Sequence, residues 1–384
     1  MPRVIRPLAL WATAASTSVW IVAAALAASE RRRRIEVAAE RPARDGPLVS
    51  IVVPARDEEG SIGETVESLL AQTYRNLELV VVDDESEDAT TARAAAVIAA
   101  DPRGRVVAGE APPEGWLGKP WALVQGVAET SGEWLLFSDA DMRHEPTAVG
   151  CALAVAQRHE LPGLSLLPRL RTGSQAEQVV LPAALTAIST FIAPGPLIRS
   201  RRSSVAISVG GWTLIRRGVY DRIGGHGAVR DRVAEDLELA RNAKAAGAPI
   251  ELCDGVPLAS LRMYHGLGGL WRGWSKNAAF GVRGGPAPAL AAAAVLGVIA
   301  LAPPLAAIAA GPRRRGLAAI GLVGWLAQAA LHLQSRPAVE TPAALAPAFP
   351  LGMIFLAAVS ARAAVRRVID GGTVWRGRHY TSAR

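Results

Sequence analysis

Two aspartates separated by one alanine, Asp139 and Asp141, follow an apolar run at residues 133–137. A short run of this kind predicts a strand that is buried on both faces, as in a parallel sheet covered by helices. Open α/β sheets bind ligands at the carboxyl ends of their strands, where these two carboxylates would lie. Two like charges this close favour a bound cation, although an Asp-rich turn explains the stretch equally well when it is taken alone.

Acidic side chains recur where a second predicted strand ends. Residues 77–82 form that strand, and Asp83 and Asp84 follow it directly. The carboxyl ends of parallel strands meet at one edge of a sheet, so the two acidic strand ends describe a negative cleft that could hold a divalent cation and, through it, phosphate. No glycine-rich phosphate loop follows either strand. A metal would therefore have to hold the phosphate, assisted by Arg56 or Lys119.

The elements that must position these residues alternate between strands and helices. Residues 48–53 predict the first strand, and the capping-box pattern from Ser61 to Glu64 opens a helix that reaches about Thr73. Further elements are predicted at 89–100 (helix), 105–108 (strand) and 121–129 (helix). Strands that alternate with helices of this length predict an α/β fold with a parallel sheet and right-handed crossovers.

A later helix begins with two more carboxylates, Glu235 and Asp236. Their position near a helix amino terminus is favourable for electrostatic reasons alone, which explains them without any function. The alternative is a general base on the acceptor side of the cleft. Between the two acidic regions, Gly210-Gly211 predicts a turn that leads into another strand.

Four uncharged runs are each at least as long as the roughly 20 apolar residues that span a bilayer as a helix. They cover residues 7–29, 284–312, 316–335 and 341–361. We interpret the first as an uncleaved anchor, because its apolar run is long for a signal peptide and lacks a clear cleavage site. A fifth run, 178–198, contains three prolines and is predicted to be an interfacial or buried helix.

Positive charges flank the apolar runs. The chain has a net charge of +8, yet residues 47–285 hold 24 Lys and Arg against 28 Asp and Glu. This distribution disfavours nucleic acid as a partner and fits the excess of basic residues on the cytoplasmic side of membrane proteins. Four arginines at 31–34 therefore predict that the following residues are cytoplasmic, and only two cysteines, Cys151 and Cys253, suit a reducing compartment.

The last three runs raise a question of topology. If all three crossed the membrane, the arginine clusters after residues 312 and 365 would lie outside the cytoplasm. If the run at 284–312 instead entered the membrane and returned on the same side, with its helix broken at Pro303-Pro304, every arginine cluster would stay inside. This hypothesis predicts that a reporter fused after Arg384 reads cytoplasmic.

An aromatic and basic cluster precedes the run at 284–312. It consists of Trp271, Arg272, Trp274 and Lys276. Such residues commonly form an interfacial belt at the membrane surface. They could instead cover a site and bind an acceptor or a leaving diphosphate, and the sequence leaves both interpretations open.

Several of these pieces occur in an order that resembles a known family. They are the segments 52–59, 82–86 and 118–123, the pair Asp139 and Asp141, the glycines 210–211, and the pair Glu235 and Asp236. Over about 48–285 this set resembles the family 2 inverting glycosyltransferases of GT-A fold. Segments 262–265, 273–277 and 375–380 are similar to its membrane-bound branch, which is associated with carotenoid and hopanoid glycosylation.

The resemblance implies an α/β fold of GT-A type, with a mixed, mostly parallel sheet and transmembrane helices at both ends. It implies an amino-terminal anchor at 1–46, a glycosyltransferase domain at 47–285 and membrane segments at 286–384. Asp236, beside Glu235, would be the catalytic base, and Asp139 and Asp141 would hold Mg²⁺ or Mn²⁺. The residues implied for nucleotide-sugar binding are Pro54, Ala55, Arg56, Glu58, Asp83, Asp84, Lys119 and Asp139.

The activity that the resemblance implies is transfer of a sugar from a nucleotide diphosphate sugar, expected to be a UDP-sugar, to a lipid acceptor such as a carotenoid, hopanoid, other isoprenoid or glycerolipid. The reaction would invert the anomeric carbon at the inner membrane, with the catalytic domain in the cytoplasm. Processive polysaccharide synthases carry Gln-x-x-Arg-Trp where this chain has the segment 272–276, which favours addition of one sugar. Alternatives are a polyprenyl phosphate acceptor, polysaccharide assembly, or a non-catalytic nucleotide-binding membrane protein.

Overall fold

The computed structural model describes residues 5–281, 285–311, 314–369, 372–375 and 378–381. The chain divides into two compact units. The sheet unit contains Arg34–Arg171 and Gly195–Met263, and the helical unit contains Met1–Arg33, Thr172–Pro194 and Tyr264–Arg384. The helical unit therefore includes residues 172–194 and 264–285, which the sequence-based boundaries assigned to the glycosyltransferase domain.

The core of the sheet unit is a seven-stranded sheet in the order β3-β2-β1-β4-β8-β6-β9. Strands β1 to β4 are parallel, β8 lies antiparallel between β4 and β6, and β9 is parallel to β6. The strands are β1 (Val49–Ala55), β2 (Leu77–Asp83), β3 (Gly104–Ala108), β4 (Trp134–Ser138), β6 (Gly163–Leu167), β8 (Trp212–Arg216) and β9 (Glu251–Asp254). All five residues of β4 are buried, which confirms the prediction from its apolar run.

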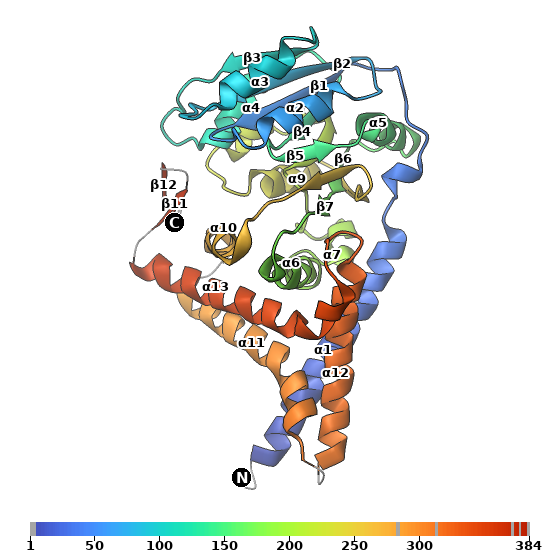
Figure 1. Cartoon of the computed structure of the whole chain (residues 1–384), viewed down its shortest axis with the longest axis vertical. Helices are drawn as coiled ribbons and strands as arrows, with labels where there is room; N and C mark the ends of the chain where they lie inside the picture. Colours follow the sequence, from blue (N-terminus) through green and yellow to red (C-terminus); the bar gives the residue numbers. More distant parts are fainter. Residues whose placement is uncertain (1–4, 282–284, 312–313, 370–371, 376–377, 382–384) are drawn as a thin grey trace. The chain divides into compact units, whose positions relative to one another are not determined.

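Helices connect these strands in the alternation expected from the sequence (Figure 1). They are α2 (Ile62–Leu70), α3 (Thr90–Ile98), α4 (Gly118–Ala128), α5 (Ala148–Arg158), α7 (Gly195–Arg199), α8 (Arg217–Arg222) and α9 (Glu235–Ala245), with short 3-10 turns η1 (Val37–Ala39) and η3 (Gly225–Val229). Two local predictions were wrong. Helix α4 begins three residues earlier than expected and includes Lys119 in its first turn. The Ser61 hydroxyl donates to Glu58 and does not cap α2.

A second sheet has three short strands in the order β5-β10-β7. They are β5 (Met142–His144), β10 (Ala259–Leu261) and β7 (Arg169–Leu170). Strand β5 begins at the residue after Asp141 and pairs antiparallel with β10. The turn that carries Asp139 and Asp141 is therefore anchored by a strand on each side.

The helical unit contains four helices that are long and apolar enough to cross a membrane. The long helices are α1 (Ile5–Arg33), α11 (Pro286–Ala309), α12 (Arg315–Ser335) and α13 (Phe349–Ile369), the last preceded by η5 (Ala343–Ala348). Figure 1 shows α1 and α12 running side by side. The unit also contains α6 (Gln175–Ala187), the π-helix η2 (Ile188–Ile192), α10 (Gly266–Gly281), β11 (Gly372–Trp375) and β12 (Arg378–Thr381).

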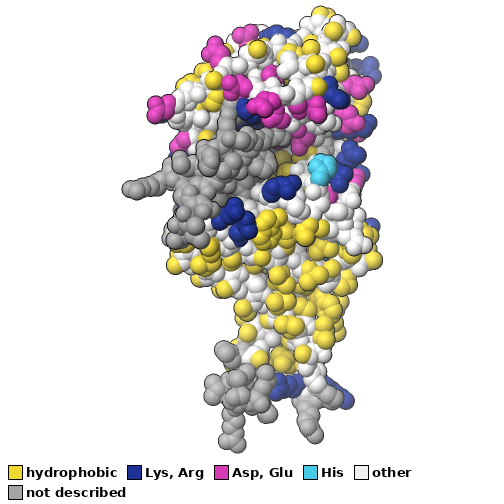
Figure 2. All heavy atoms as spheres, turned by 60° about the vertical axis from the view of Figure 1, so that its left-hand side comes forward, with side chains coloured by type: hydrophobic (Ala, Val, Ile, Leu, Met, Phe, Trp, Pro, Cys, Tyr) yellow, Lys and Arg dark blue, Asp and Glu magenta, His cyan; other side chains and the backbone are white. Residues whose placement is uncertain are grey.

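The four predicted apolar runs are confirmed as helices, and the fifth run is not among the candidate spans. Its first part forms α6, whose buried residues include Leu181 and Ala183. The candidate spans also expose large apolar side chains, such as Trp11 and Ile308, each 71% exposed. In Figure 2 hydrophobic side chains cover much of the helical unit. Apolar exposure on this scale fits a protein that places these helices in lipid.

Helix α11 continues through Pro303-Pro304, so the expected break at these prolines was wrong. Proline has no backbone N–H, and it leaves the carbonyl four residues earlier without its helical partner. The carbonyls concerned are those of Ile299 and Ala300. In an apolar environment each unpaired carbonyl would cost several kcal/mol, so other donors must reach them.

Side chains of two neighbouring helices supply those donors. Ser16 Oγ and Trp20 Nε1, both on α1, donate to the Ile299 carbonyl, each at 2.6 Å. Gln328 Nε2, on α12, donates to the Ala300 carbonyl at 3.0 Å. The proline pair is therefore tolerated because polar side chains from α1 and α12 replace the missing backbone donors.

Replacing Gln328 with leucine is expected to destabilise the helical unit by about 1–3 kcal/mol, because the buried Ala300 carbonyl loses its donor. Thermal unfolding of the detergent-solubilised chain measures this loss. The matched control is Gln334→Leu on the same helix, since Gln334 makes only a long 3.4 Å contact with the Ala24 carbonyl. Equal unfolding temperatures for the two variants would contradict the explanation.

Candidate functional site

Lys119 lies between two carboxylates at the carboxyl edge of the main sheet. Its Nζ atom is 2.7 Å from Asp139 Oδ1 and 2.7 Å from Glu235 Oε1. Asp139 follows β4, Lys119 lies in the first turn of α4, and Glu235 begins α9. Burial by itself lowers the pKa of Lys119, but the carboxylates of Asp139, Glu235 and Asp236 outweigh it and raise the pKa well above its usual value. The lysine is therefore a fixed positive charge in this cluster.

Asp236 adjoins this cluster and is held by backbone donors. The N–H groups of Gly210 and Leu237 donate to its two oxygens, each at 2.8 Å. Glycine at position 210 allows this close approach, because a Cβ atom there would lie 3.0 Å from Asp236 Oδ2 and would push the carboxylate aside. Burial, followed by the negative charge of Glu235, raises the pKa of Asp236 to about 6. A carboxylate of this kind is ionised at neutral pH and well suited to accept a proton.

Asp141 lies in an environment that is unfavourable for its negative charge. Burial, followed by the charges of Asp139 and Glu58, raises its pKa to about 7. Full ionisation of the carboxylates around Asp141 is therefore unfavourable, and an added positive charge would stabilise them. A divalent cation meets this requirement, since hard cations bind carboxylate oxygen.

Among the residues that the structure describes, no group of three or more His, Cys, Asp or Glu is arranged to hold a metal ion. Two carboxylates fit Mg²⁺ or Mn²⁺ nevertheless, because Mg²⁺ in particular is usually held by one or two carboxylates together with substrate phosphates and water. The donor set and the raised pKa of Asp141 are both compatible with such an ion.

One pocket brings together five of the candidate site residues that the sequence analysis proposed, from both ends of the sheet unit. It is lined by Pro54, Lys119, Asp139, Glu235 and Asp236, together with Leu123, Phe137, Ser138, Ser208, Gly210, Thr213, His226 and Leu239. The acidic turn after β4 and the acidic start of α9 thus face the same space. These two segments are about 100 residues apart, and nothing in the sequence indicated directly that they would meet.

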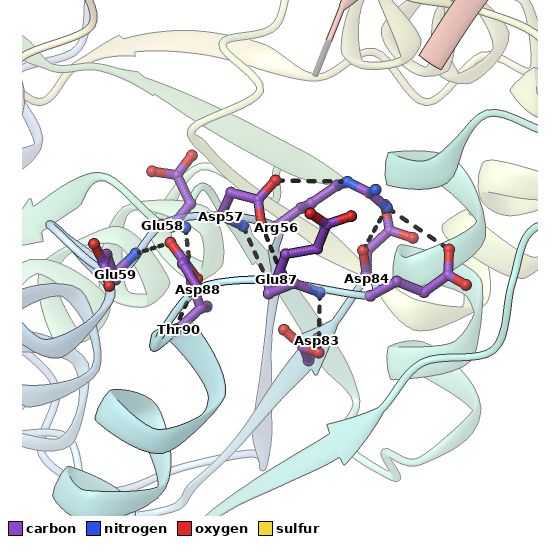
Figure 3. Close-up of polar contacts among 11 residues, drawn as sticks. Arg56, Asp57, Glu58, Glu59, Asp83, Asp84, Glu87, Asp88 and Thr90 are labelled. Carbon is purple, nitrogen blue, oxygen red and sulfur yellow. Dashed lines mark hydrogen bonds and ion pairs between the residues drawn. The ribbon is translucent and has the colours of Figure 1, made fainter. Parts of the chain in front are cut away.

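The two loops after β1 and β2 form a second polar region beside this one. Arg56 Nη1 donates to the Asp84 carbonyl at 2.8 Å and lies within 4.0 Å of the carboxylates of Asp84 and Glu85 (Figure 3). The backbone of Ala55 joins the same region, because its carbonyl accepts from the Asp84 N–H at 2.8 Å. These contacts fix both loops at the carboxyl edge of the sheet.

Residues that the sequence analysis did not select hold the two loops together. The N–H groups of Glu58 and Glu59 donate to Thr90 Oγ1 at 2.7 Å and to Asp88 Oδ2 at 3.1 Å, as Figure 3 shows. Asp88 also accepts from the Thr90 N–H at 2.9 Å, just before α3. An aspartate at a helix start is a known capping signal, but its second bond to a loop 29 residues away has no sequence signature.

Asp83 differs from its neighbour Asp84 in its hydrogen bonding. Asp83 Oδ2 accepts from the Ser86 N–H at 3.3 Å. Asp83 Oδ1 is buried and has no hydrogen-bond partner within the described part of the chain. A buried carboxylate oxygen without a donor is costly, so a hydrogen-bond donor that reached this atom would stabilise it.

The aromatic and basic cluster predicted near residue 271 belongs to the helical unit. The ring of Trp271 on α10 packs against Phe355 on α13 at 5.6 Å, and the Arg362 guanidinium lies 5.6 Å from the same ring. Trp274 packs against the apolar core of the unit, and Arg272 is exposed. These contacts explain Trp271 and Trp274 as packing residues of α10. The side chain of Lys276 lies outside the described residues.

Comparison with known proteins identifies similar sequences and folds. A model described as glycosyl transferase family 2 matches residues 50–224. The 4,4'-diaponeurosporenoate glycosyltransferases of Staphylococcus haemolyticus and Staphylococcus aureus are 27% and 28% identical over 238 and 254 residues. The alignments cover 61% and 65% of this chain and the same shares of the relatives, so the chain spans about three-fifths of their length.

A solved structure shares the architecture. A mannosyltransferase from Pyrobaculum calidifontis, in complex with GDP-Man and Mn²⁺, is similar with a TM-score of 0.54. The match covers 95% of this chain and 99% of that chain at 19% identity, a level that shows the fold alone.

Proposed function

Because this chain belongs to glycosyl transferase family 2, we propose that it transfers a single sugar from a nucleotide diphosphate sugar to a lipid acceptor at the membrane. The observation that carries the proposal is the position of Lys119 between Asp139 and Glu235. That contact joins the acidic turn after β4 to the start of α9, where Asp236 lies. Groups suited to a charged donor and a group suited to proton removal therefore share one pocket.

On the acceptor side, Asp236 takes the proton of the acceptor hydroxyl. The acceptor oxygen then attacks the anomeric carbon from the face opposite to the diphosphate. A new carbon–oxygen bond forms as the bond to the diphosphate breaks, and its electron pair leaves with the nucleoside diphosphate. A single displacement of this kind inverts the configuration at the anomeric carbon.

On the donor side, Asp139 and Asp141 would hold Mg²⁺ or Mn²⁺. When bound, the ion neutralises negative charge on the departing diphosphate. Lys119 contributes a further positive charge in the same pocket. Pro54, Ala55, Arg56, Glu58 and Asp84 form the wall of the nucleotide site, and Asp83 binds the base through its unpartnered oxygen.

A uridine nucleotide is compatible with this base contact. Asp83 Oδ1 can only accept a hydrogen bond when ionised, and uracil offers a ring N–H. Replacing Asp83 with alanine is expected to weaken donor binding by about 10-fold to 100-fold, the cost of one hydrogen bond to a charged group. Calorimetry with UDP measures this. The control is Asp88→Asn, which should alter loop stability more than base selectivity, and unchanged UDP affinity in the alanine variant would contradict the assignment.

The acceptor is a lipid, since the chain carries four helices able to cross a membrane. Carotenoids, hopanoids, other isoprenoids and glycerolipids all present a polar group at the interface. The names of the two staphylococcal relatives specify an acid anion, and an acceptor of that class brings no proton for Asp236 to remove. In that case Asp236 would orient the acceptor. A polyprenyl phosphate acceptor requires the same pocket and the same membrane, and polysaccharide assembly is the remaining alternative.

The sheet unit is proposed to lie in the cytoplasm at the inner membrane. Arg31, Arg32 and Arg33 form the last turn of α1, and basic residues at a helix end favour the cytoplasmic side. Reporter fusions within the segment 34–46 and after Arg384 test this orientation at both ends of the chain. A periplasmic signal from the first fusion would overturn it.

The decisive experiment supplies the purified chain with a panel of nucleotide sugars and a bacterial lipid extract, and titrates Mg²⁺ and Mn²⁺. Mass spectrometry of the lipids is expected to show addition of one hexose, dependent on both the donor and the metal. Nucleotide binding without transfer or donor hydrolysis would instead support a non-catalytic nucleotide-binding protein. A product on polyprenyl phosphate, or one with several sugars, would replace the proposed acceptor with an alternative.

A further inference from the structure

Three buried side chains form a hydrogen-bonded chain beneath the turn that carries Asp139 and Asp141. Trp212 Nε1 donates to His144 Nδ1 at 3.1 Å, and His144 Nε2 lies 3.1 Å from Ser138 Oγ. Ser138 Oγ donates in turn to the Asp139 carbonyl at 3.1 Å. Trp212, His144 and Ser138 are each at most 3% exposed. The sequence analysis selected none of the three.

Only one arrangement of protons satisfies this chain. The indole N–H of Trp212 can only donate, so His144 Nδ1 must accept. The imidazole proton then lies on Nε2 and is donated to Ser138 Oγ, whose own proton is donated to the Asp139 carbonyl. Burial lowers the pKa of His144 to about 3, which keeps the ring neutral with this single tautomer. The hydrogen bonds therefore all donate in one direction, from Trp212 toward Asp139.

The hydrogen bonds from Trp212 through His144 to Ser138 connect the two halves of the proposed site. Trp212 directly follows Gly210 and Gly211, and the Gly210 N–H binds Asp236. Ser138 directly precedes Asp139. His144 thus links the segment that holds the proposed base to the turn that holds the proposed metal ligands.

The turn has other contacts as well, including the ion pair of Lys119 with Asp139 and Glu235. The Asp139 N–H reaches the Gly211 carbonyl at only 3.4 Å, and Thr65 Oγ1 binds the Ala140 carbonyl at 2.8 Å. The second contact fixes the turn to α2, away from α9. Strands β4 and β8 pair directly at Ser138 and Trp212, and the hydrogen bonds through His144 add a side-chain link between the turn and the β8 segment.

We propose that His144 is a positioning residue, which sets the distance between the Asp139 and Asp141 turn and Asp236 through its bonds to Ser138 and Trp212. This inference rests on the proposed function of those carboxylates. It assigns His144 no contact with the substrate. Its loss should therefore change metal binding and turnover together, because both depend on how the turn is held.

The test compares His144→Phe, which keeps ring volume but removes both bonds, with His144→Gln, whose amide can still accept one bond and donate another. The matched control is Tyr74→Phe. Tyr74 is fully buried, and its hydroxyl donates to the Pro47 carbonyl at 2.5 Å near the amino ends of the strands, remote from the site. Each variant is measured for Mn²⁺ affinity in the presence of UDP by electron paramagnetic resonance, for kcat at saturating Mn²⁺, and for thermal unfolding.

His144→Phe is expected to weaken Mn²⁺ binding and to lower kcat by about 10-fold to 100-fold each, as for other groups that orient metal ligands. His144→Gln should recover most of both losses, and Tyr74→Phe should lower only the unfolding temperature. Equal Mn²⁺ affinity in His144→Phe and Tyr74→Phe would overturn the inference. If His144→Phe does not fold, Ser138→Ala gives the same comparison with a smaller change. Unchanged Mn²⁺ affinity in Asp141→Asn would overturn the proposed function as well, so the two failures are distinguishable.

Discussion

Replacing Asp236 with asparagine should lower kcat by about 10²-fold to 10⁴-fold, the usual contribution of a general base. The variant keeps the size of the side chain but cannot take a proton from the acceptor. Donor binding should change little, because Lys119 contacts Asp139 and Glu235 directly and not Asp236. Initial rates with saturating donor and a lipid extract, together with UDP affinity, give both quantities.

The substitution also has a structural cost that a control must separate. Both oxygens of Asp236 accept backbone N–H bonds, and asparagine can accept only one of them. Glu78→Gln provides the match, since Glu78 accepts from the Ser131 N–H at 2.7 Å and from Ser50 Oγ at 2.8 Å near the amino end of β2. This variant should lose stability without losing turnover. If kcat falls by less than 10-fold in a fully folded Asp236→Asn variant, Asp236 is not the general base. That result would favour an acid anion as the acceptor.

Replacing Asp141 with asparagine should have opposite effects on activity and on stability. Transfer should fall about 1,000-fold, roughly 4 kcal/mol of transition-state stabilisation, because the metal loses a carboxylate ligand. The metal-free protein should become more stable at pH 8 by roughly 1–4 kcal/mol, because a buried charge repelled by Asp139 and Glu58 is removed. Transfer assays with Mn²⁺, and thermal unfolding in a chelator, measure the two effects.

The pH dependence of the stability gain has a definite sign. The pKa of Asp141 is about 7 in the folded chain and 3.8 in its ordinary environment. The protonated carboxyl is therefore fully compatible with the fold at low pH, and its contribution is lost as the pH rises from about 4 through 7. The advantage of the asparagine variant should be largest above pH 7 and should shrink toward pH 4. A gain that is independent of pH would show that relief of charge repulsion is not its cause.

Several parts of the fold could be predicted from the sequence because their signals are local. The unbroken apolar run before Asp139 predicted a strand buried on both faces, and the structure confirms it as β4. The long uncharged runs predicted helices able to cross a membrane, and four such helices are present. The ordered motifs predicted a GT-A type fold, which the mixed sheet and the structural similarity confirm.

Local predictions were wrong where a partner outside the expected pattern changed the outcome. The Ser61 hydroxyl bonds to Glu58 in the preceding loop and does not cap α2. Pro303-Pro304 does not break α11, because Ser16, Trp20 and Gln328 supply the missing donors from other helices. In both places the competing partner lies outside the segment that carries the sequence pattern.

The sequence by itself determined which residue types stand at the ends of the strands, since a strand's burial and its end depend on a few consecutive residues. It placed Asp139 and Asp141 after one strand, and Asp83 and Asp84 after another. Only the tertiary structure decided what meets them. Strand β8 pairs antiparallel with β4, which brings Gly210 and Trp212 beside the acidic turn, and Lys119 joins Asp139 to Glu235. Those contacts depend on strand order over about 100 residues, and local periodicity carries no information on that order.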